Sequence, residues 1–162
     1  MVAPTPARVR ADRHCLIVLE GVLRAAEPLE GCALLLGTQA GSTLTLQRIW
    51  PCCNGWQPAA ERHQRFQLDP REQLLAQRWA RQRGLQVLGS AHSHPSSPAV
   101  PSATDRRLCL GPTLMLIRSG LNTTTSALRA WWLLEAAEGE LAAVDELPLR
   151  IASATGAGHL GE

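Results

Sequence analysis

The chain has 162 residues, of which 45% are apolar, and a formal net charge of +2 at pH 7. This length suffices for one domain with a sizeable core. No segment approaches the roughly 18 apolar residues of a membrane span, and the small charge argues against a nucleic-acid partner. The N-terminal arginines are not followed by the apolar segment of a secretory signal, so we expect a cytoplasmic protein that does not act at a membrane.

The cysteines agree with a reducing compartment, because an odd number without an export signal argues against a disulfide framework. We expect most of them to be small buried hydrophobic residues; they are Cys15, Cys32, Cys52, Cys53 and Cys109. The adjacent pair is not a CxxC motif, which argues against a zinc ribbon. Tyrosine is absent, so acid–base chemistry would fall to Glu, Asp or His.

The N-terminal part predicts an arm, a helix and a hairpin. Residues 1–12 are rich in Pro, Ala and Arg and are expected to be disordered. Apolar residues at helical spacing predict a helix over 14–26, which Pro28 ends. Residues 31–37 and 42–50 then predict two strands of a hairpin.

The remaining elements alternate between helices and strands. Residues 51–64 read as a loop, and residues 65–68 as a possible short strand. Asp69 and Pro70 are typical of a helix start, and Gly84 of its end. Further along we expect a strand, a short helix and three strands, at 85–93, 102–110, 113–119, 128–135 and 141–149. The pattern predicts one α/β (α+β) domain over 13–150, with a mixed, largely antiparallel sheet flanked by helices, and a flexible C-terminal tail over 151–162.

Two histidines and an aspartate have the spacing of metal ligands. His92 and His94 stand two apart in a predicted strand, so their side chains share one face. A proline-rich loop then leads to Asp105, in the first turn of the next predicted helix. Three protein ligands with one position left open are typical of catalytic zinc, whereas structural zinc has four protein ligands.

Each residue also has an ordinary structural interpretation. An isolated HxH pair is more often a surface or core pair than a metal site. Ser102 with Asp105 three residues later is also what a capped helix start looks like. Glu30, ahead of the first strand, would by itself be read as a surface carboxylate.

Taken together, HSHP…PSxxD over 92–105 resembles the signature of the JAMM (MPN+) zinc metalloproteases, in their prokaryotic stand-alone form. Ser102 lies eight residues past His94, and Asp105 three further, as in that family. Glu30 precedes an apolar strand in the matching context Glu-x-Cys-x-Leu-Leu-x-Gly, with Ala33 in place of the usual glycine. Weaker matches are Asn54, the Phe66–Pro70 segment and Gly89.

The resemblance implies a cytidine-deaminase-like JAMM/MPN architecture and a role for each matched residue. His92, His94 and Asp105 would ligate Zn²⁺. Glu30 would take the proton from the attacking water and pass it to the leaving amine, and Ser102 would stabilise the oxyanion. These roles fit the general requirements of amide hydrolysis, which needs an activated water, a proton for the nitrogen and a donor for the developing charge.

The resemblance also implies a substrate, namely the C-terminal tail of a ubiquitin-like or sulfur-carrier protein that ends in Gly-Gly. Such a tail would lie extended beside a sheet edge. Trp56, in a polar loop, is the tryptophan that we expect to contact it.

Two other functions remain for comparison. A non-catalytic MPN scaffold module that binds a protein partner would have lost metal ligands, whereas this chain has all of them. A zinc nucleobase deaminase needs a PCxxC segment and a glutamate two residues after a histidine, and this sequence has neither.

Overall fold

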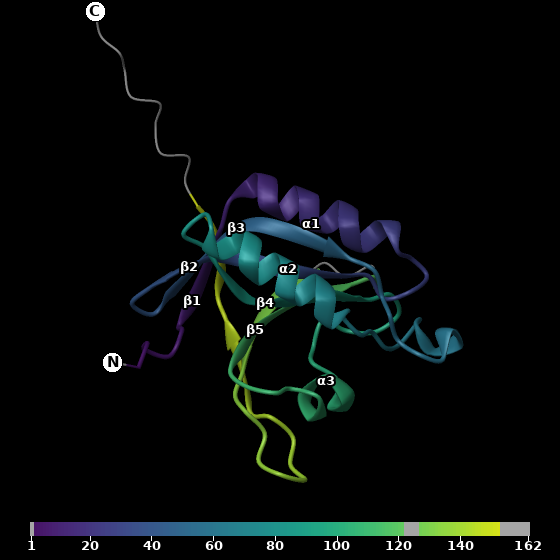
Figure 1. Cartoon of the computed structure of the whole chain (residues 1–162). Coiled ribbons are helices and arrows are strands. Elements are labelled where there is room, and N and C mark those ends of the chain that lie inside the picture. Colours follow the sequence, from purple (N-terminus) through teal and green to yellow (C-terminus); the bar gives the residue numbers. More distant parts are fainter. Residues whose placement is uncertain (1, 122–126, 153–162) are drawn as a thin grey trace, which may run out of the picture.

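The computed structural model describes residues 2–121 and 127–152. In this part of the chain an eight-stranded sheet has the strand order β7-β6-β5-β4-β2-β3-β1-β8. Three α-helices accompany it (Figure 1). The strands are β1 Arg8–Ala11, β2 Cys32–Ala40, β3 Thr43–Cys52, β4 Gln86–His94, β5 Thr113–Ser119, β6 Leu128–Leu133, β7 Val144–Leu147 and β8 Leu149–Ile151. The helices are α1 Arg13–Ala25, α2 Pro70–Arg81 and α3 Ala103–Arg107, with a 3-10 turn at Ala59–Glu61.

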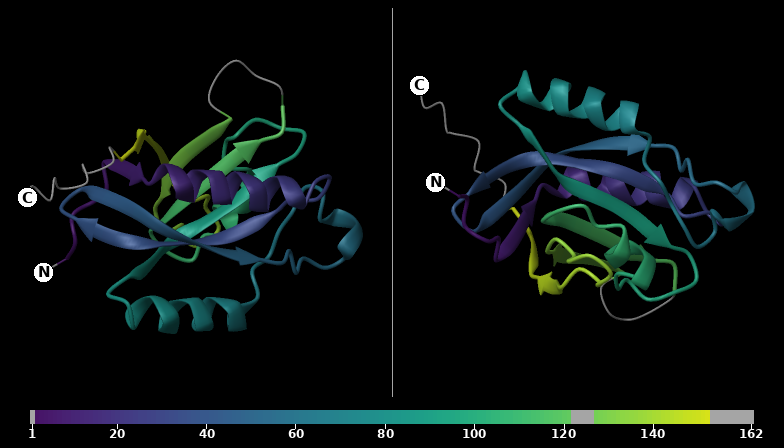
Figure 2. Two further views of the ribbon diagram at one scale, coloured as in Figure 1. Left: turned by 90° about the horizontal axis from the view of Figure 1, so that it is seen from above. Right: turned by 60° about the horizontal axis from the view of Figure 1, so that its bottom comes forward.

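The sheet is mixed, as the sequence predicted. Strands β2–β3, β2–β4, β5–β6 and β6–β7 pair antiparallel. Strands β4–β5, β1–β3 and β1–β8 pair parallel. Figure 2 shows α1 and α2 on opposite faces of the β2–β3–β4 region, so the fold has three layers and its α+β class is confirmed.

Helix α1 covers one face of the sheet. The Asp12 carboxylate accepts a hydrogen bond from His14 N at 2.7 Å and caps the helix. Helical spacing places Leu19 and Leu23 on one buried stripe, which packs against Ala33 and Leu35 of β2. Burial of such leucines contributes about 1.5–3 kcal/mol each.

Helix α2 covers the opposite face. It begins as predicted, with Asp69 as N-cap and Pro70 as first residue. Its Ala76 and Ala80 pack against Leu34 and Leu36. Because successive residues of a strand point to opposite faces, β2 is buried on both sides, and the segment that follows Glu30 is held firmly between two layers.

Three predictions about elements were wrong. Residues 8–11 of the expected disordered arm form β1, because Val9 and Ala11 are fully buried against α1 and the sheet. Residues 65–68 have no strand pairing. The single strand expected over 141–149 is interrupted before Leu149, and the β8 part pairs with β1. The predicted tail of 151–162 lies outside the described residues from 153 onward.

The consecutive tryptophans of β6 face opposite sides, as strand alternation requires. Trp131 is 8% exposed and donates from Nε1 to the Ala99 carbonyl at 2.8 Å. Trp132 packs on the α1 side of the sheet. The Trp131 bond ties the loop after β4 to the sheet, close to the histidines. Among the described helices, none is long and apolar enough to cross a membrane.

Candidate metal centre

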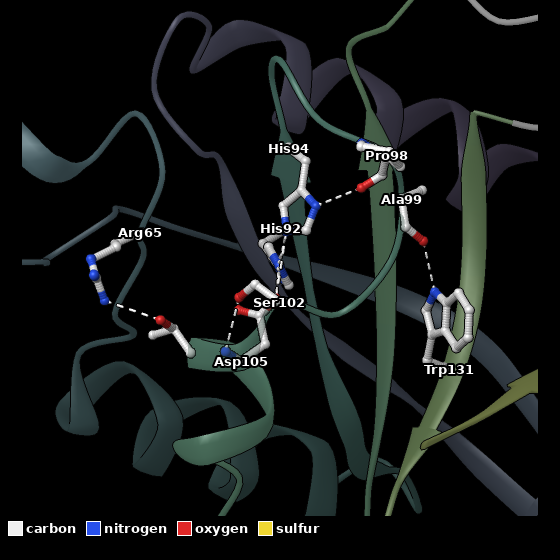
Figure 3. Close-up of polar contacts among 9 residues, drawn as sticks. Arg65, His92, His94, Pro98, Ala99, Ser102, Asp105 and Trp131 are labelled. Atoms are coloured by element: carbon white, nitrogen blue, oxygen red, sulfur yellow. Dashed lines mark hydrogen bonds and ion pairs between the residues drawn. The ribbon is translucent and has the colours of Figure 1, made fainter. Parts of the chain in front are cut away.

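The C-terminal end of β4 carries the two histidines, both buried and directed to the same side (Figure 3). Their Nε2 atoms lie 3.0 Å apart. Asp105 of α3 approaches from across the loop, with Oδ2 at 3.2 Å from His92 Nε2 and 3.5 Å from His94 Nε2. Three potential ligand atoms from two elements therefore converge on one point.

The spacing of these atoms fits a tetrahedral ion. Ligand atoms at 2.0–2.1 Å from zinc are separated by about 3.3 Å at the tetrahedral angle, and the observed separations are 3.0–3.5 Å. Within residues 2–121 and 127–152, His92, His94 and Asp105 are the group of three or more such side chains that can share an ion.

Contacts with a backbone carbonyl and with an aromatic ring orient the two histidine side chains toward the site. His94 Nδ1 lies 2.8 Å from the Pro98 carbonyl, which can only accept, so Nδ1 carries the proton. Against the effect of burial, Asp105 and the Pro98 carbonyl raise the pKa of His94, and when the ring is neutral the lone pair of Nε2 faces the site. The Phe66 ring stacks on His92 with centroids 4.3 Å apart. Burial lowers the pKa of His92, which keeps its imidazole neutral and able to bind a cation.

Asp105 is held by the cap of its own helix. Ser102 Oγ accepts from Asp105 N at 3.0 Å, and Asp105 Oδ2 accepts from Ser102 N at 2.8 Å, which is a capping box. Burial opposes ionisation of Asp105, but His92, His94 and the Ser102 N–H together hold its pKa well below the usual range. The structural interpretation of Ser102 and Asp105 is thus correct, and the same cap aims the carboxylate at the histidines.

Glu30 lies beside this cluster, although it is far away in sequence. The backbone N–H of Ser93 donates to the Gly31 carbonyl at 3.0 Å, and Gly31 N donates to Ser93 Oγ at 2.8 Å. Gly31 is therefore opposite Ser93, which puts Glu30 at the level of His94. Its side chain is 4% exposed, and burial raises the pKa of Glu30 to about 7, with a partly compensating effect of the positive charge of His94.

Asn54 fastens the Glu30 segment to the loop after β3. Its Nδ2 donates to the Glu30 carbonyl at 3.1 Å and to the Arg65 carbonyl at 2.7 Å. Its Oδ1 accepts from Trp56 N at 3.0 Å. Asn54, one of the weaker motif matches, therefore connects three segments around the site.

A groove of about 840 Å³ opens beside Asp105. Its walls come from the loop before α2, from α3 and from the segment that follows α3, and include Trp56, Arg65, Phe66, Leu108 and Met115. Trp56, the predicted contact residue, is half-buried and donates from Nε1 to Glu61 at 3.1 Å. It lies along the groove rather than among the metal ligands.

Sequence reasoning named His92, His94, Asp105, Glu30 and Ser102, and the structure brings all five together. It missed Ser93, which orients the Glu30 segment, the Pro98 carbonyl, which fixes the His94 tautomer, and Arg65 at the groove. The position of Ser93 between two histidines on a strand was a usable signal, because it must point to the opposite face. The other two contacts have no signal in the sequence.

Known proteins resemble this chain in sequence and structure. A protein from Desulfitobacterium hafniense superposes with a TM-score of 0.75 at 30% identity, covering 89% of this chain and 92% of its own. One from Salinibacter ruber superposes at 0.59 and 26% identity, covering 91% and 94%. The desampylase of Haloferax volcanii is 36% identical over 85 residues, or 52% of this chain, which spans 58% of that relative's length.

The family described as prokaryotic homologues of the JAB domain matches residues 18–134. The match begins in α1, includes the whole ligand cluster and Glu30, and ends just after β6. The chain therefore belongs to the prokaryotic JAB-domain family, a branch of the JAMM/MPN family.

Proposed function

We propose that this protein is a zinc-dependent JAMM-type metallopeptidase that hydrolyses an amide bond at the C-terminal tail of a ubiquitin-like or sulfur-carrier protein. The observation that carries the proposal is the convergence of His92 Nε2, His94 Nε2 and Asp105 Oδ2 beside a buried glutamate. The similarity to a protein named desampylase supports it.

His92, His94 and Asp105 would hold the zinc, because their neutral imidazoles and carboxylate are the donor types that zinc prefers. Zinc, when bound, supplies a Lewis acid that polarises a carbonyl and lowers the pKa of a water to about 7. The protein fixes the donors through the Pro98 carbonyl and the capping box. Such supporting contacts typically change metal affinity by about 10–100-fold.

Glu30 would move the proton. Hydrolysis adds water to the carbonyl carbon and breaks the C–N bond, so that one proton of the water must reach the leaving nitrogen. A carboxylate whose pKa is about 7 can both take and return that proton near neutral pH. Because Glu30 is nearly inaccessible to solvent, bulk water does not exchange protons with it during the transfer.

Ser102 would donate to the oxygen on which negative charge develops. Its Oγ accepts the Asp105 N–H, and this leaves the hydroxyl proton available, since a hydroxyl has one donor in addition to its lone pairs. Capping and oxyanion stabilisation are therefore compatible in the same side chain.

The substrate side of the proposal rests on the groove next to Asp105. The groove is lined by apolar side chains such as Phe66 and Leu108 and by polar ones such as Gln67 and Thr104, which suits an extended peptide. Trp56 would contact this tail. The resemblance to the JAMM family implies that the tail would end in Gly-Gly. The reaction would take place in the cytoplasm.

The test combines zinc content with cleavage. The purified protein should contain about one zinc per chain and cleave a carrier protein joined to a small amine through its Gly-Gly terminus. Glu30→Gln should retain zinc and lose at least about 10²-fold in rate, whereas the exposed Glu138→Gln should match the wild type. Full activity of Glu30→Gln would refute the assignment of the proton carrier.

The alternative is a non-catalytic MPN scaffold. A protein that binds no zinc when supplied with it, and that nevertheless binds a carrier protein, would favour this alternative. The complete, buried donor set argues for the enzyme instead.

A further inference from the structure

Arg65 occupies an unusual place for a cation. Its guanidinium lines the groove together with Asp105, and Nη1 donates to Thr104 Oγ1 at 3.1 Å, one residue before the aspartate. Figure 3 shows it on the far side of Asp105 from the two histidines. Arg65 and Asp105 therefore belong to the wall of the same groove.

Neighbouring side chains hold Arg65 in this position. Its guanidinium carbon lies 5.4 Å from the centre of the Trp56 ring. Glu61 Oε2 lies 3.4 Å from Nε and also accepts the Trp56 indole N–H. Asn54 binds the Arg65 carbonyl. The backbone of Arg65 and one face of its guanidinium are therefore already held in place. Such a side chain loses little further conformational entropy when it binds a ligand.

Arg65 has donors beyond its bond to Thr104 and its ion pair with Glu61. A guanidinium has five N–H donors, and in the described residues one hydrogen bond from this group is found, to Thr104. Nε is buried without a hydrogen-bond partner there. The side chain as a whole is 36% exposed, and the residue lines the groove. Planar donors of this kind match a carboxylate.

Amide hydrolysis creates a carboxylate at this place. The acyl half of the substrate changes from a neutral amide to an anion, next to Glu30 and Asp105, which are themselves acidic. Among the residues that line the groove, Arg65 and Arg107 are the cations, and Arg65 is the one bonded to the residue adjacent to Asp105.

We propose that Arg65 is the binding residue for the newly formed C-terminal carboxylate of the carrier protein, so that the groove prefers the product acid to the corresponding amide. The inference rests on the proposed hydrolysis. It assigns Arg65 to the acyl side of the scissile bond and predicts inhibition by the free, Gly-Gly-ending product.

The experiment compares two peptides on metal-free protein, so that zinc does not attract the acid. The probes are a six-residue peptide ending in Gly-Gly with a free carboxylate and the same peptide as its C-terminal amide. Wild type should bind the acid about 10-fold more tightly, as expected for one charge-assisted contact. Arg65→Gln should bind the two equally, and Arg65→Lys should keep part of the preference.

Two further variants separate charge from loop structure. Thr104→Val removes the acceptor that Arg65 uses but keeps the cation, so the preference for the acid should persist. Arg62→Gln removes the bond from Arg62 Nε to the Trp56 carbonyl in the same loop and should also leave the preference intact. If the preference for the acid is lost in the Arg62→Gln single variant as well as in the Arg65→Gln single variant, loop order and not the Arg65 charge is responsible. That result would overturn the assignment.

Equal binding of acid and amide by the wild type, including binding of both too weak to measure at millimolar concentration, would overturn the inference. So would a preference that survives Arg65→Gln. If the wild type prefers the acid but cleaves no conjugate when loaded with zinc, the proposed hydrolysis fails and the carboxylate site stands. If it cleaves conjugates without any acid preference, the carboxylate site alone fails.

Discussion

The hydroxyl of Ser93 accepts a hydrogen bond from the backbone N–H of Gly31 at 2.8 Å, across 62 residues of sequence. Ser93 stands between the two histidine ligands and points away from them, and Gly31 follows Glu30. Together with the bond from Ser93 N to the Gly31 carbonyl, this hydrogen bond holds the segment of the proposed proton carrier against the strand of the proposed metal ligands. It is also fully buried, since Ser93 is 0% exposed.

Ser93→Ala should consequently lower activity more than it lowers zinc affinity. The Gly31 N–H would be left buried without an acceptor, which costs about 1–3 kcal/mol, and the Glu30 segment would be free to shift. A misplacement of about 1 Å can cost on the order of 10² in rate. The measurements are kcat, zinc content and thermal unfolding. Ser96→Ala, an exposed serine of the following loop, should match the wild type in all three.

Ser102 can be tested for its two roles separately. Alanine at an N-cap costs about 1 kcal/mol relative to serine, whereas glycine costs only a few tenths. Ser102→Ala and Ser102→Gly should both lose about 10²–10³ in kcat, because both lack the donor to the oxyanion. Only the alanine variant should show the larger loss of unfolding free energy. Activity that follows stability across the two variants would mean that capping explains the whole effect.

The stability of the metal-free protein should depend on Glu30. Its pKa is 4.5 in an unfolded chain and about 7 in the folded protein. Because the folded state holds the proton more tightly, stability is complete below pH 4.5 and falls as the pH rises to 7. The loss is about 3 kcal/mol at pH 8. Glu30→Gln, which cannot ionise, should therefore be more stable than wild type at pH 8 and similar to it at pH 4.5.

Urea unfolding of both proteins at these two pH values, in the presence of a chelator, checks this prediction. A wild type that is as stable as Glu30→Gln at pH 8 would show that the carboxylate ionises in the folded protein without cost. Glu138→Gln, at an exposed position, should not change the pH dependence.

Two glycines should respond oppositely to alanine. A Cβ at Gly37 would lie 1.9 Å from the Thr45 carbonyl oxygen, where β2 and β3 pass each other at a bulge, so Gly37→Ala should cost several kcal/mol or prevent folding. A Cβ at Gly21, on the exposed side of α1, meets nothing within 4 Å. Gly21→Ala should stabilise the protein by about 0.5–1 kcal/mol. Thermal denaturation of the two variants measures both effects.

The sequence by itself determined the elements whose signals are local. The i, i+2 spacing put His92 and His94 on one face because side chains alternate along any strand, and Asp69-Pro70 marked the start of α2 because both residue types favour that position. The split motif identified the family and with it Glu30, Ser102 and Asp105. In each case the information lies in residues a few positions apart, or in a motif already known.

Only the tertiary structure decided which distant groups meet. The bond from Gly31 to Ser93, the Pro98 carbonyl on His94 and the placement of Arg65 beside Thr104 depend on how three layers pack. Strand β1 exists because Val9 and Ala11 find a buried place between α1 and the sheet, although the composition around them favoured disorder. Such contacts join residues far apart in the chain, and their free energy appears only when the whole fold brings them together, so no local pattern records them.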